Sequence, residues 1–274
     1  MQVIRKEIEY GRADKFTFYP IGDMHTGVIH CDEDLLKETV SEINHNPKAI
    51  WLGMGDYADL ITPGDFRRWE GKILAPWMKG AEDNIGPTQL ERVDEILSPI
   101  WNKCLGLIDG NHDDEIRRAH HYNFMGELLK KANRKHEVPH AGVSCFLELI
   151  FRRKGSAEAH SFIIHARHGE GAARTSGARS MAVLRLSQSM VNAHVTLMGH
   201  LHGQESPDRP QGLLLQRGKI KSFESIATMT GAWLRAYMQD VPPCYLERWG
   251  CPKIIFEPNK QSMTLVKTRK IGNI

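Results

Sequence analysis

Leu105-Gly-Leu-Ile-Asp-Gly-Asn-His-Asp-Asp-Glu115 is the stretch from which the organisation of the whole chain can be worked out. Its apolar start, up to Ile108, is typical of a buried strand, and it breaks at Gly110 into an amide, an imidazole and carboxylates. Polar side chains of these three kinds at the end of a strand suit a binding or catalytic site better than a core. One such tetrapeptide is weak evidence, but four other strand ends in the chain have the same layout.

Each of those four ends follows an apolar run that predicts a strand. The runs cover 15–22, 48–55, 160–165 and 194–198, and the clusters that follow them are Asp23-Met-His25, Asp56, His168-Gly169 and His200-Leu-His202. Residues 32–46 have helical spacing, with Asp32 or Asp34 placed to cap the helix. Strands and helices that alternate in this way predict an α/β fold with parallel strands. Because ligands of such sheets bind at the carboxyl ends of the strands, we expect the five clusters to meet on one rim.

The remaining segments predict further elements. Residues 61–87 interleave proline and glycine with Trp69 and Trp77, which indicates a loop-rich insertion with short helical pieces, a lid or a substrate wall. Helical periodicity covers 88–104, bent near Pro99, then 114–131, and a segment that follows Arg179 and ends near 192. A strand is expected at 143–151, and antiparallel strands at 212–215, 220–229, 253–256 and 263–266 are expected to close a second sheet. No repeat or linker interrupts the chain, so residues 1–274 are expected to form a single domain.

Composition places few limits on function. An apolar fraction of 41%, a charged fraction of 25% and a net charge of +3 describe an ordinary globular protein, and require neither a nucleic-acid nor a membrane partner. The five cysteines are scattered without a Cys-x-x-Cys pair, which argues against a disulfide framework or a structural zinc site; they are Cys31, Cys104, Cys145, Cys244 and Cys251. Charges interrupt the N-terminal residues where a signal peptide needs an apolar run, so a cytoplasmic location is expected.

The side chains at the five strand ends form a mixed set of nitrogen and oxygen ligands. They are Asp23, His25, Asp56, Asn111, His168, His200 and His202. Imidazoles and carboxylates without thiolates suit Mn²⁺, which we favour, or Fe, Co, Ni or Zn. Seven ligands are too many for one tetrahedral ion and suit two divalent ions about 3.5–4 Å apart, bridged by one carboxylate. Such a pair clamps a phosphoryl group and activates water at neutral pH.

In this order the motifs resemble those of the calcineurin-like metallophosphoesterase superfamily. The matching segments are Asp23-Met-His25, Gly55-Asp-Tyr-Ala-Asp59, Gly110-Asn-His-Asp113, His168-Gly169 and Gly199-His-Leu-His202, which together span residues 23–203. The resemblance implies a sandwich of two mixed β-sheets flanked by helices. It also implies that Asp23, His25 and His202 hold one metal, that Asn111, His168 and His200 hold the other, and that Asp56 bridges them.

The same resemblance assigns the chemistry. His112 would contact the phosphate and protonate the leaving oxygen, and Asp113 is placed to orient that imidazole. The nucleophile would be a hydroxide that bridges the metals, with no phosphoenzyme. His165 is the alternative to His168 for the fourth motif, and otherwise a core residue or a neighbour of the ligands. Asp59 is either a structural turn residue or a partner of the ligands.

Two groups of residues outside the motifs have open interpretations. Arg167, Arg174, Arg179 and Arg185 are candidates for binding phosphate, with a solvated basic face as the alternative. Trp69 and Trp77 either stack on a base or simply pack.

The motif details narrow the expected substrate. Protein phosphatases of the superfamily carry Arg-Gly after the second motif and Glu in the third, whereas this chain has Leu60-Ile61 and Asp113. The third motif looks more like that of bacterial, archaeal and phage phosphodiesterases and of the DNA nucleases of double-strand-break repair. The run from His168 through Arg174 to Ala178 resembles phage- or prophage-encoded members. We therefore expect a phosphodiesterase or phosphatase that acts on nucleotides or nucleic-acid ends. Members of the superfamily are often dimers, so the resemblance makes a homodimer one candidate and leaves the oligomeric state open. The alternatives are a DNA nuclease of the double-strand-break-repair type and a non-catalytic scaffold, although the scaffold would be expected to lack ligands.

Overall fold

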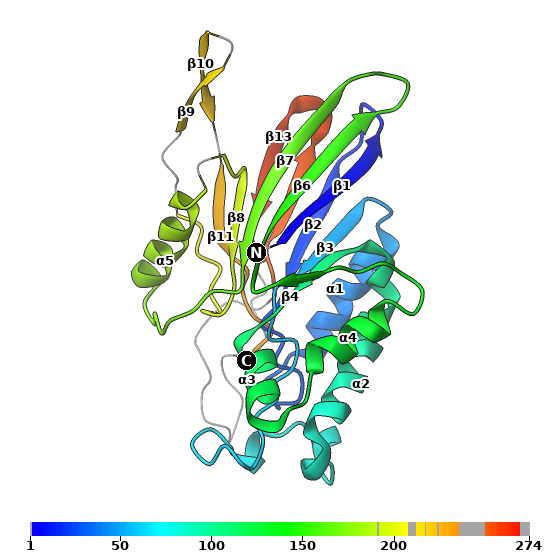
Figure 1. Ribbon diagram of the computed structural model, residues 1–274, viewed down its shortest axis with the longest axis vertical. Coiled ribbons are helices and arrows are strands. Elements are labelled where there is room, and N and C mark those ends of the chain that lie inside the picture. The colour runs from blue at the N-terminus through cyan, green and yellow to red at the C-terminus, as the bar shows by residue number, and fades with distance from the viewer. Residues whose placement is uncertain are drawn as a thin grey trace.

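Two β-sheets face each other in the computed structural model, which describes residues 2–190, 192–207, 212–216, 218–223, 225–235 and 250–268 (Figure 1). The first sheet has the strand order β13-β12-β2-β3-β4-β5, and the second has the order β1-β6-β7-β8-β11. The strands are β1 (Gln2–Tyr10), β2 (Phe16–Ile21), β3 (Ala49–Gly53), β4 (Cys104–Ile108), β5 (His140–Gly142), β6 (Ser144–Arg153), β7 (Ala159–Arg167), β8 (Val195–Met198), β9 (Gly212–Gln216), β10 (Lys219–Phe223), β11 (Ile226–Met229), β12 (Lys253–Glu257) and β13 (Ser262–Val266).

Five α-helices in the described residues accompany the sheets: α1 (Glu33–His45), α2 (Ile85–Leu97), α3 (Asn111–His120), α4 (Phe124–Ala132) and α5 (Ser176–Gln188). In Figure 1, α1, α2 and α4 lie on one side of the sandwich and α5 on the other. Both sheets mix parallel and antiparallel pairs. In the first sheet β2, β3 and β4 run parallel while β12 runs antiparallel to β2. In the second sheet β7 and β8 run parallel while β6 and β7 run antiparallel. The expected α/β fold of two mixed sheets flanked by helices is confirmed.

The alternation of side chains along the strands builds two separate cores. On β2, Phe16 and Phe18 point between the sheets, where they pack with Phe151 and Phe162. On the same strand, Tyr19 and Ile21 belong to the core under α1 and α2. Because both faces of this sheet are covered, its strands read as nearly continuous apolar runs, which is why they were recognisable in the sequence.

The helix predictions were correct in kind and shifted in extent. Helix α1 begins at its predicted cap, where the Asp32 side chain accepts a hydrogen bond from the Leu35 N–H. Helix α2 begins at residue 85, inside the predicted insertion, and the 3-10 segment Ser98–Lys103 continues it. The helix predicted over 114–131 is wrong, because the chain leaves the helical conformation at His121, whose φ is +55°, and restarts at the cap Asn123.

The strand predictions missed two strands and one direction. No strand was predicted over β1 or β5, because β1 is an exposed edge strand with little apolar periodicity and β5 has three residues. The prediction of antiparallel strands in the tail holds for β12 and β13 but is wrong for β11, which pairs with β8 in parallel. Strands β9 and β10 form a two-stranded sheet of their own. Within 220–229, residue 224 lies outside the described residues, as does Cys244.

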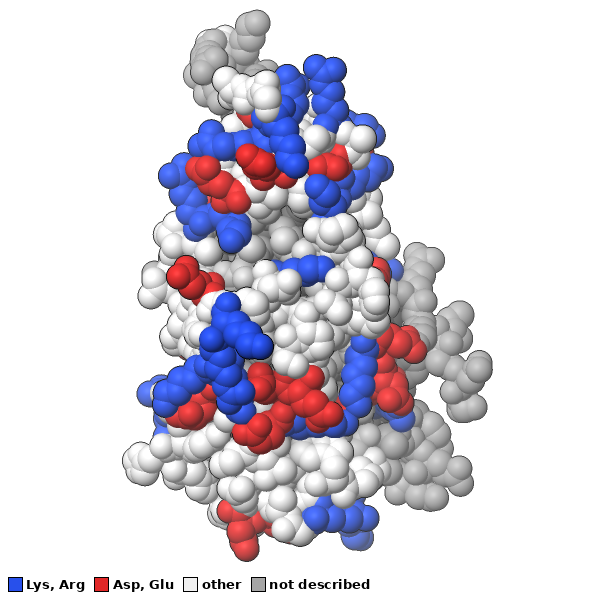
Figure 2. Space-filling view, turned by 90° about the vertical axis from the view of Figure 1, so that its right-hand side faces the viewer, with Lys and Arg blue, Asp and Glu red and all other residues white. Residues whose placement is uncertain are grey.

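The surface around α2 and α4 carries both signs of charge (Figure 2). Lys131 pairs with Glu91 and Asp94. Arg92 pairs with Glu33 and Glu95, so basic and acidic side chains neutralise one another in this region. Around α2 and α4, these described basic side chains therefore lie beside acidic ones. None of the helices in the described part of the chain is both long and apolar enough to cross a membrane.

Candidate metal centre

The five polar clusters meet at one end of the sandwich. Asp23 follows β2, Asp56 follows β3 and Asn111 follows β4, all in the first sheet; His168 follows β7 and His200 follows β8, both in the second. The clusters therefore meet as predicted, although from two facing sheets and not from the rim of one. All seven predicted ligands and His112 belong to this group of side chains.

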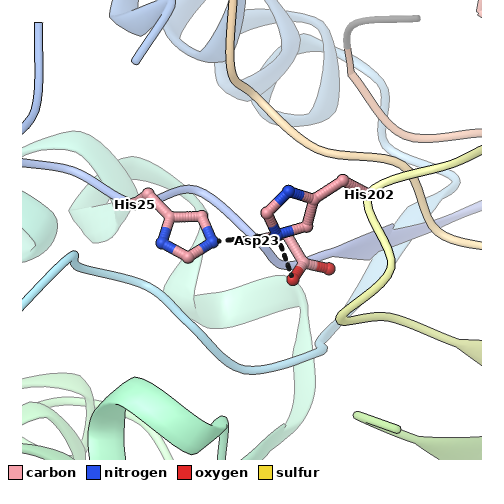
Figure 3. Close-up of side chains that lie close together, drawn as sticks. All are labelled: Asp23, His25 and His202. Atoms are coloured by element: carbon pink, nitrogen blue, oxygen red, sulfur yellow. Dashed lines mark hydrogen bonds and ion pairs between the residues drawn. The ribbon is translucent and has the colours of Figure 1, made fainter. Parts of the chain in front are cut away.

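The first group consists of Asp23, His25 and His202 (Figure 3). The Nε2 atoms of the two imidazoles lie 3.1 Å apart, and His202 Nε2 lies 3.4 Å from Asp23 Oδ1. The Asp23 side chain is fully buried and also accepts the backbone N–H of His200 on both oxygens. Residues more than 170 positions apart in the chain are thus held within the reach of a single ion.

The second group contains Asp56, Asn111, His168 and His200. Nε2 of His168 lies 3.2 Å from Asp56 Oδ2 and 3.0 Å from Asn111 Oδ1. Nδ1 of His200 lies 2.7 Å from the same amide oxygen. Asp56 also lies 3.9 Å from His25, through Oδ2 and Nε2, and so stands between the two groups.

Backbone carbonyls decide which imidazole nitrogen faces the centre. His168 Nδ1 lies 2.7 Å from the Met54 carbonyl and His200 Nε2 lies 2.9 Å from the Gly171 carbonyl, so these nitrogens carry the protons. The other nitrogen of each ring then faces the Asn111 side-chain amide. With the NH2 group of that amide turned toward the rings, it donates to both of them and to Asp56 Oδ2. Imidazoles whose second nitrogen is held by a backbone carbonyl in this way are typical of metal ligands. The donor set therefore fits divalent ions.

The backbone of the ligand loops is strained. Asp23, His25, Asp56, His200 and His202 all have φ between +47° and +68°, in the left-handed region that residues with a Cβ rarely adopt. Such conformations cost about 1–3 kcal/mol each and concentrate at functional sites. Five of the seven predicted ligands adopt these conformations. The loops therefore accept backbone strain at the positions that bring the side chains together.

Two glycines allow the loops after β3 and β4 to touch. A Cβ on Gly110 would lie 2.1 Å from Asp56 Oδ1, and one on Gly55, whose φ is +90°, would lie 2.7 Å from Gly110 Cα. Both glycines were part of the predicted motifs, but only the tertiary contact shows what they do.

His112 and Asp113 are held differently from the prediction. The contact to His112 Nδ1 comes from the Asp59 backbone carbonyl, which fixes the ring and leaves Nε2 for a substrate. Asp113 Oδ2 instead accepts the N–H groups of Gly110, at 2.8 Å, and Asp56, at 3.0 Å. Asp113 thus holds the backbone around the ligands, and the expectation that it orients the imidazole is corrected. The role of Asp59 was left open in the sequence analysis. No feature of the sequence distinguishes a backbone carbonyl that supports an imidazole ring from one in an ordinary turn.

Burial and neighbouring charges shift the pKa values of the side chains in the centre. Burial would raise the pKa of Asp56, but the imidazoles of His168, His112 and His25 outweigh it and hold that pKa well below its ordinary value. Burial and the neighbouring Asp56 carboxylate raise the pKa of Asp113. Burial lowers the pKa of His25, which favours the neutral imidazole that can bind a metal. The centre therefore keeps the Asp56 carboxylate ionised.

A pocket of about 200 Å³ opens over the two groups. It is lined by ligands, by His112 and by the segment Gly171 to Arg174. Of the four arginines considered in the sequence, Arg174 lines this pocket. Arg179 is buried and bonded to Glu205 at 2.8 Å, so it supports the structure. Of the two tryptophans, Trp77 donates its indole N–H to Glu33 and packs with Trp69 in a small core of the insertion.

Comparisons with known proteins add little to this geometry. No protein-family model matches the chain, and no curated protein matches it. A solved structure that aligns with it is a conserved uncharacterized protein of Streptococcus pneumoniae, described as a predicted phosphoesterase. The two are 12% identical, the match covers 89% of this chain and 84% of the other, and the TM-score is 0.33.

Proposed function

We propose that the chain is a dinuclear metal-dependent hydrolase of phosphoesters, a phosphodiesterase or phosphatase that acts on nucleotides or nucleic-acid ends. The observation that supports this most is the pair of adjacent ligand groups with Asp56 between them. Two ions at such spacing suit the opposite sides of a phosphoryl group, whereas a structural ion needs one closed set of ligands. The open pocket above the groups provides the space for a substrate.

The contacts support one assignment of the ligands. Asp23, His25 and His202 would hold one ion, Asn111, His168 and His200 the other, and Asp56 both; this is the proposed assignment of the ligands. We favour Mn²⁺ because a mixed set of imidazole, carboxylate and amide ligands suits it, and Fe, Co, Ni or Zn are also compatible. Bound divalent ions supply Lewis acidity, which offsets charge on the phosphoryl group and yields a nucleophile from water at neutral pH.

The protein groups then position the substrate and move the proton. His112 lines the pocket, and the Asp59 carbonyl on its Nδ1 keeps the ring in one orientation, so Nε2 can donate a proton to the leaving oxygen. Arg174, at the mouth of the same pocket, can bind a non-bridging phosphate oxygen or a neighbouring phosphate. A neighbouring phosphate is found in nucleotides and nucleic-acid ends, which is why we place the substrate in that class.

An assay with two chromogenic substrates tests the proposal. The purified chain with Mn²⁺ is given bis-p-nitrophenyl phosphate or p-nitrophenyl phosphate, and metal content is measured in parallel. We expect diester turnover that Asp56→Asn abolishes together with loss of bound metal. We expect His112→Ala to retain metal and to lose about 10²–10⁴-fold in kcat, the usual contribution of a general acid. His45→Ala, at an exposed position on α1, is the matched control and should change neither property.

The other outcomes divide the alternatives. Turnover of the monoester alone would favour a phosphatase. Cleavage of duplex DNA ends in preference to small diesters would favour the nuclease. Absence of bound metal in the wild-type chain would contradict the proposal and leave a binding protein with this fold.

A further inference from the structure

A second pocket lies on the outer face of the five-stranded sheet, beside α5. Its volume is about 640 Å³, and its residues come from the ends of β6, β7 and β8 and from one face of α5. None of the residues that line it also lines the pocket over the metal centre.

The floor of this pocket contains a polar group that lacks a partner. His165 is 3% exposed and lines the pocket, and its Nδ1 has no hydrogen-bond partner among the described residues, while its Nε2 lies 3.5 Å from Ser144 Oγ. Buried polar groups are almost always satisfied, so this imidazole nitrogen without a partner indicates a ligand that completes it.

Two basic side chains and one acidic side chain lie at the rim of the pocket. Arg167 lines it from β7, Arg185 from α5 and Glu170 from the loop after β7. Arg185 is exposed, and no carboxylate among the described residues pairs with it. Arg167 pairs with Glu170 at 3.0 Å, but the Glu170 side chain is 78% exposed, and so exposed a pair is weak. An anionic ligand can displace it, and two guanidinium groups suit a phosphate.

The walls are apolar. Ala182 and Leu186 on α5 and Met198 on β8 supply them, and Phe146 stacks on the His165 ring at 4.7 Å between centroids. The volume falls in the range of pockets that hold nucleotide-sized molecules, and a few polar groups within an apolar lining are their usual composition. From rim, floor and walls together, we propose that this pocket binds a small organic phosphate of nucleotide size, with the phosphate at Arg167 and Arg185 and an uncharged polar ring against His165. The proposal does not depend on the activity of the metal centre.

Calorimetric titration of the full chain tests the proposal with three probes: adenosine 5′-monophosphate, adenosine and inorganic phosphate. Each is titrated into the protein as purified and into protein stripped of metal by a chelator. We expect binding of the monophosphate to persist after stripping, because no predicted metal ligand lines this pocket. The double variant Arg167→Gln with Arg185→Gln should weaken the monophosphate at least tenfold and adenosine less than twofold. Arg174→Gln, at the other pocket, is the matched control and should leave binding to the stripped protein unchanged.

A third variant tests the floor. His165→Phe keeps the ring stacked on Phe146 and removes the nitrogens, so it should weaken the monophosphate and adenosine alike without affecting inorganic phosphate. Thermal melting checks that the variants fold, and Arg185→Gln alone replaces the double variant if the double variant does not. Absence of monophosphate binding to stripped protein at millimolar concentration would overturn the proposal, as would binding that the arginine variants do not alter.

Discussion

Gly110 shows how one residue without a side chain determines the position of a ligand. A Cβ at this position would overlap Asp56 Oδ1 and the Asp56 backbone nitrogen, at 2.1 and 2.2 Å. We therefore expect Gly110→Ala to displace the Asp56 carboxylate and to reduce the proposed hydrolytic activity by about 10²-fold or more, as small misplacements do. Steady-state kinetics and metal analysis measure the effect. Gly177→Ala makes the same substitution in open space and is the control; full activity in Gly110→Ala would show that the two loops can separate without harm.

Asp113 supports the backbone around Asp56, whereas the sequence alone predicted that it orients the His112 imidazole. Its carboxylate satisfies two buried backbone N–H groups, those of Asp56 and Gly110. Asp113→Ala leaves both unsatisfied, so we expect about 1–3 kcal/mol of lost stability in chemical denaturation and weaker metal binding. Asp114→Ala, at the next position, removes only ion pairs with Arg117 and Arg118 and should cost less than about 1 kcal/mol. Equal losses in the two variants would contradict this role of Asp113.

Helix α5 begins with one residue that stabilises the helix, its N-cap Thr175, and one that destabilises it, Gly177. The Thr175 side chain caps it by accepting the Ala178 N–H, while Gly177 adds backbone freedom where a Cβ would meet nothing within 4 Å. We expect Gly177→Ala to stabilise the chain by about 0.4–1 kcal/mol and Thr175→Ala to destabilise it by about 0.5–2 kcal/mol. Urea unfolding measures both. A free energy of unfolding that neither variant changes would mean that α5 does not unfold together with the rest of the chain.

At the scale of the whole molecule, the space between the sheets should exclude solvent and reagents. Burial raises the pKa of Cys145, which lies between the sheets, to about 12, and that of Cys251 also to about 12. A raised thiol pKa leaves almost no thiolate at pH 8, and the thiolate is the reactive form. In a Cys244→Ser variant, we expect Cys145 and Cys251 to resist a thiol reagent for hours at pH 8 in the folded chain and to react at once in denaturant. Mass spectrometry locates the label, and rapid labelling of folded Cys145 would show that the sandwich opens.

The sequence predicted the architecture where burial is uniform. The strands β2, β3 and β4 in the middle of the first sheet are covered on both faces, so their apolar runs and the glycines after them were visible as patterns. Strand β1 was missed because its residues pair at an exposed edge, and β11 was given the wrong direction because direction depends on the path of the chain between strands. The helix break at His121 had no proline or glycine to indicate it.

The sequence by itself determined which chemical groups the centre contains, because residue type and spacing after each strand are local properties. The assignment of the ligands to two ions stays a prediction until metal is bound and measured. Only the tertiary structure decided how the groups are held: by the carbonyls of Met54, Asp59 and Gly171 and by the carboxylate of Asp113. These supports come from segments distant in the chain, and every residue has a carbonyl, so nothing in the sequence distinguishes the ones that orient an imidazole. The same holds for the pocket beside α5, which exists only because the helix covers part of the sheet.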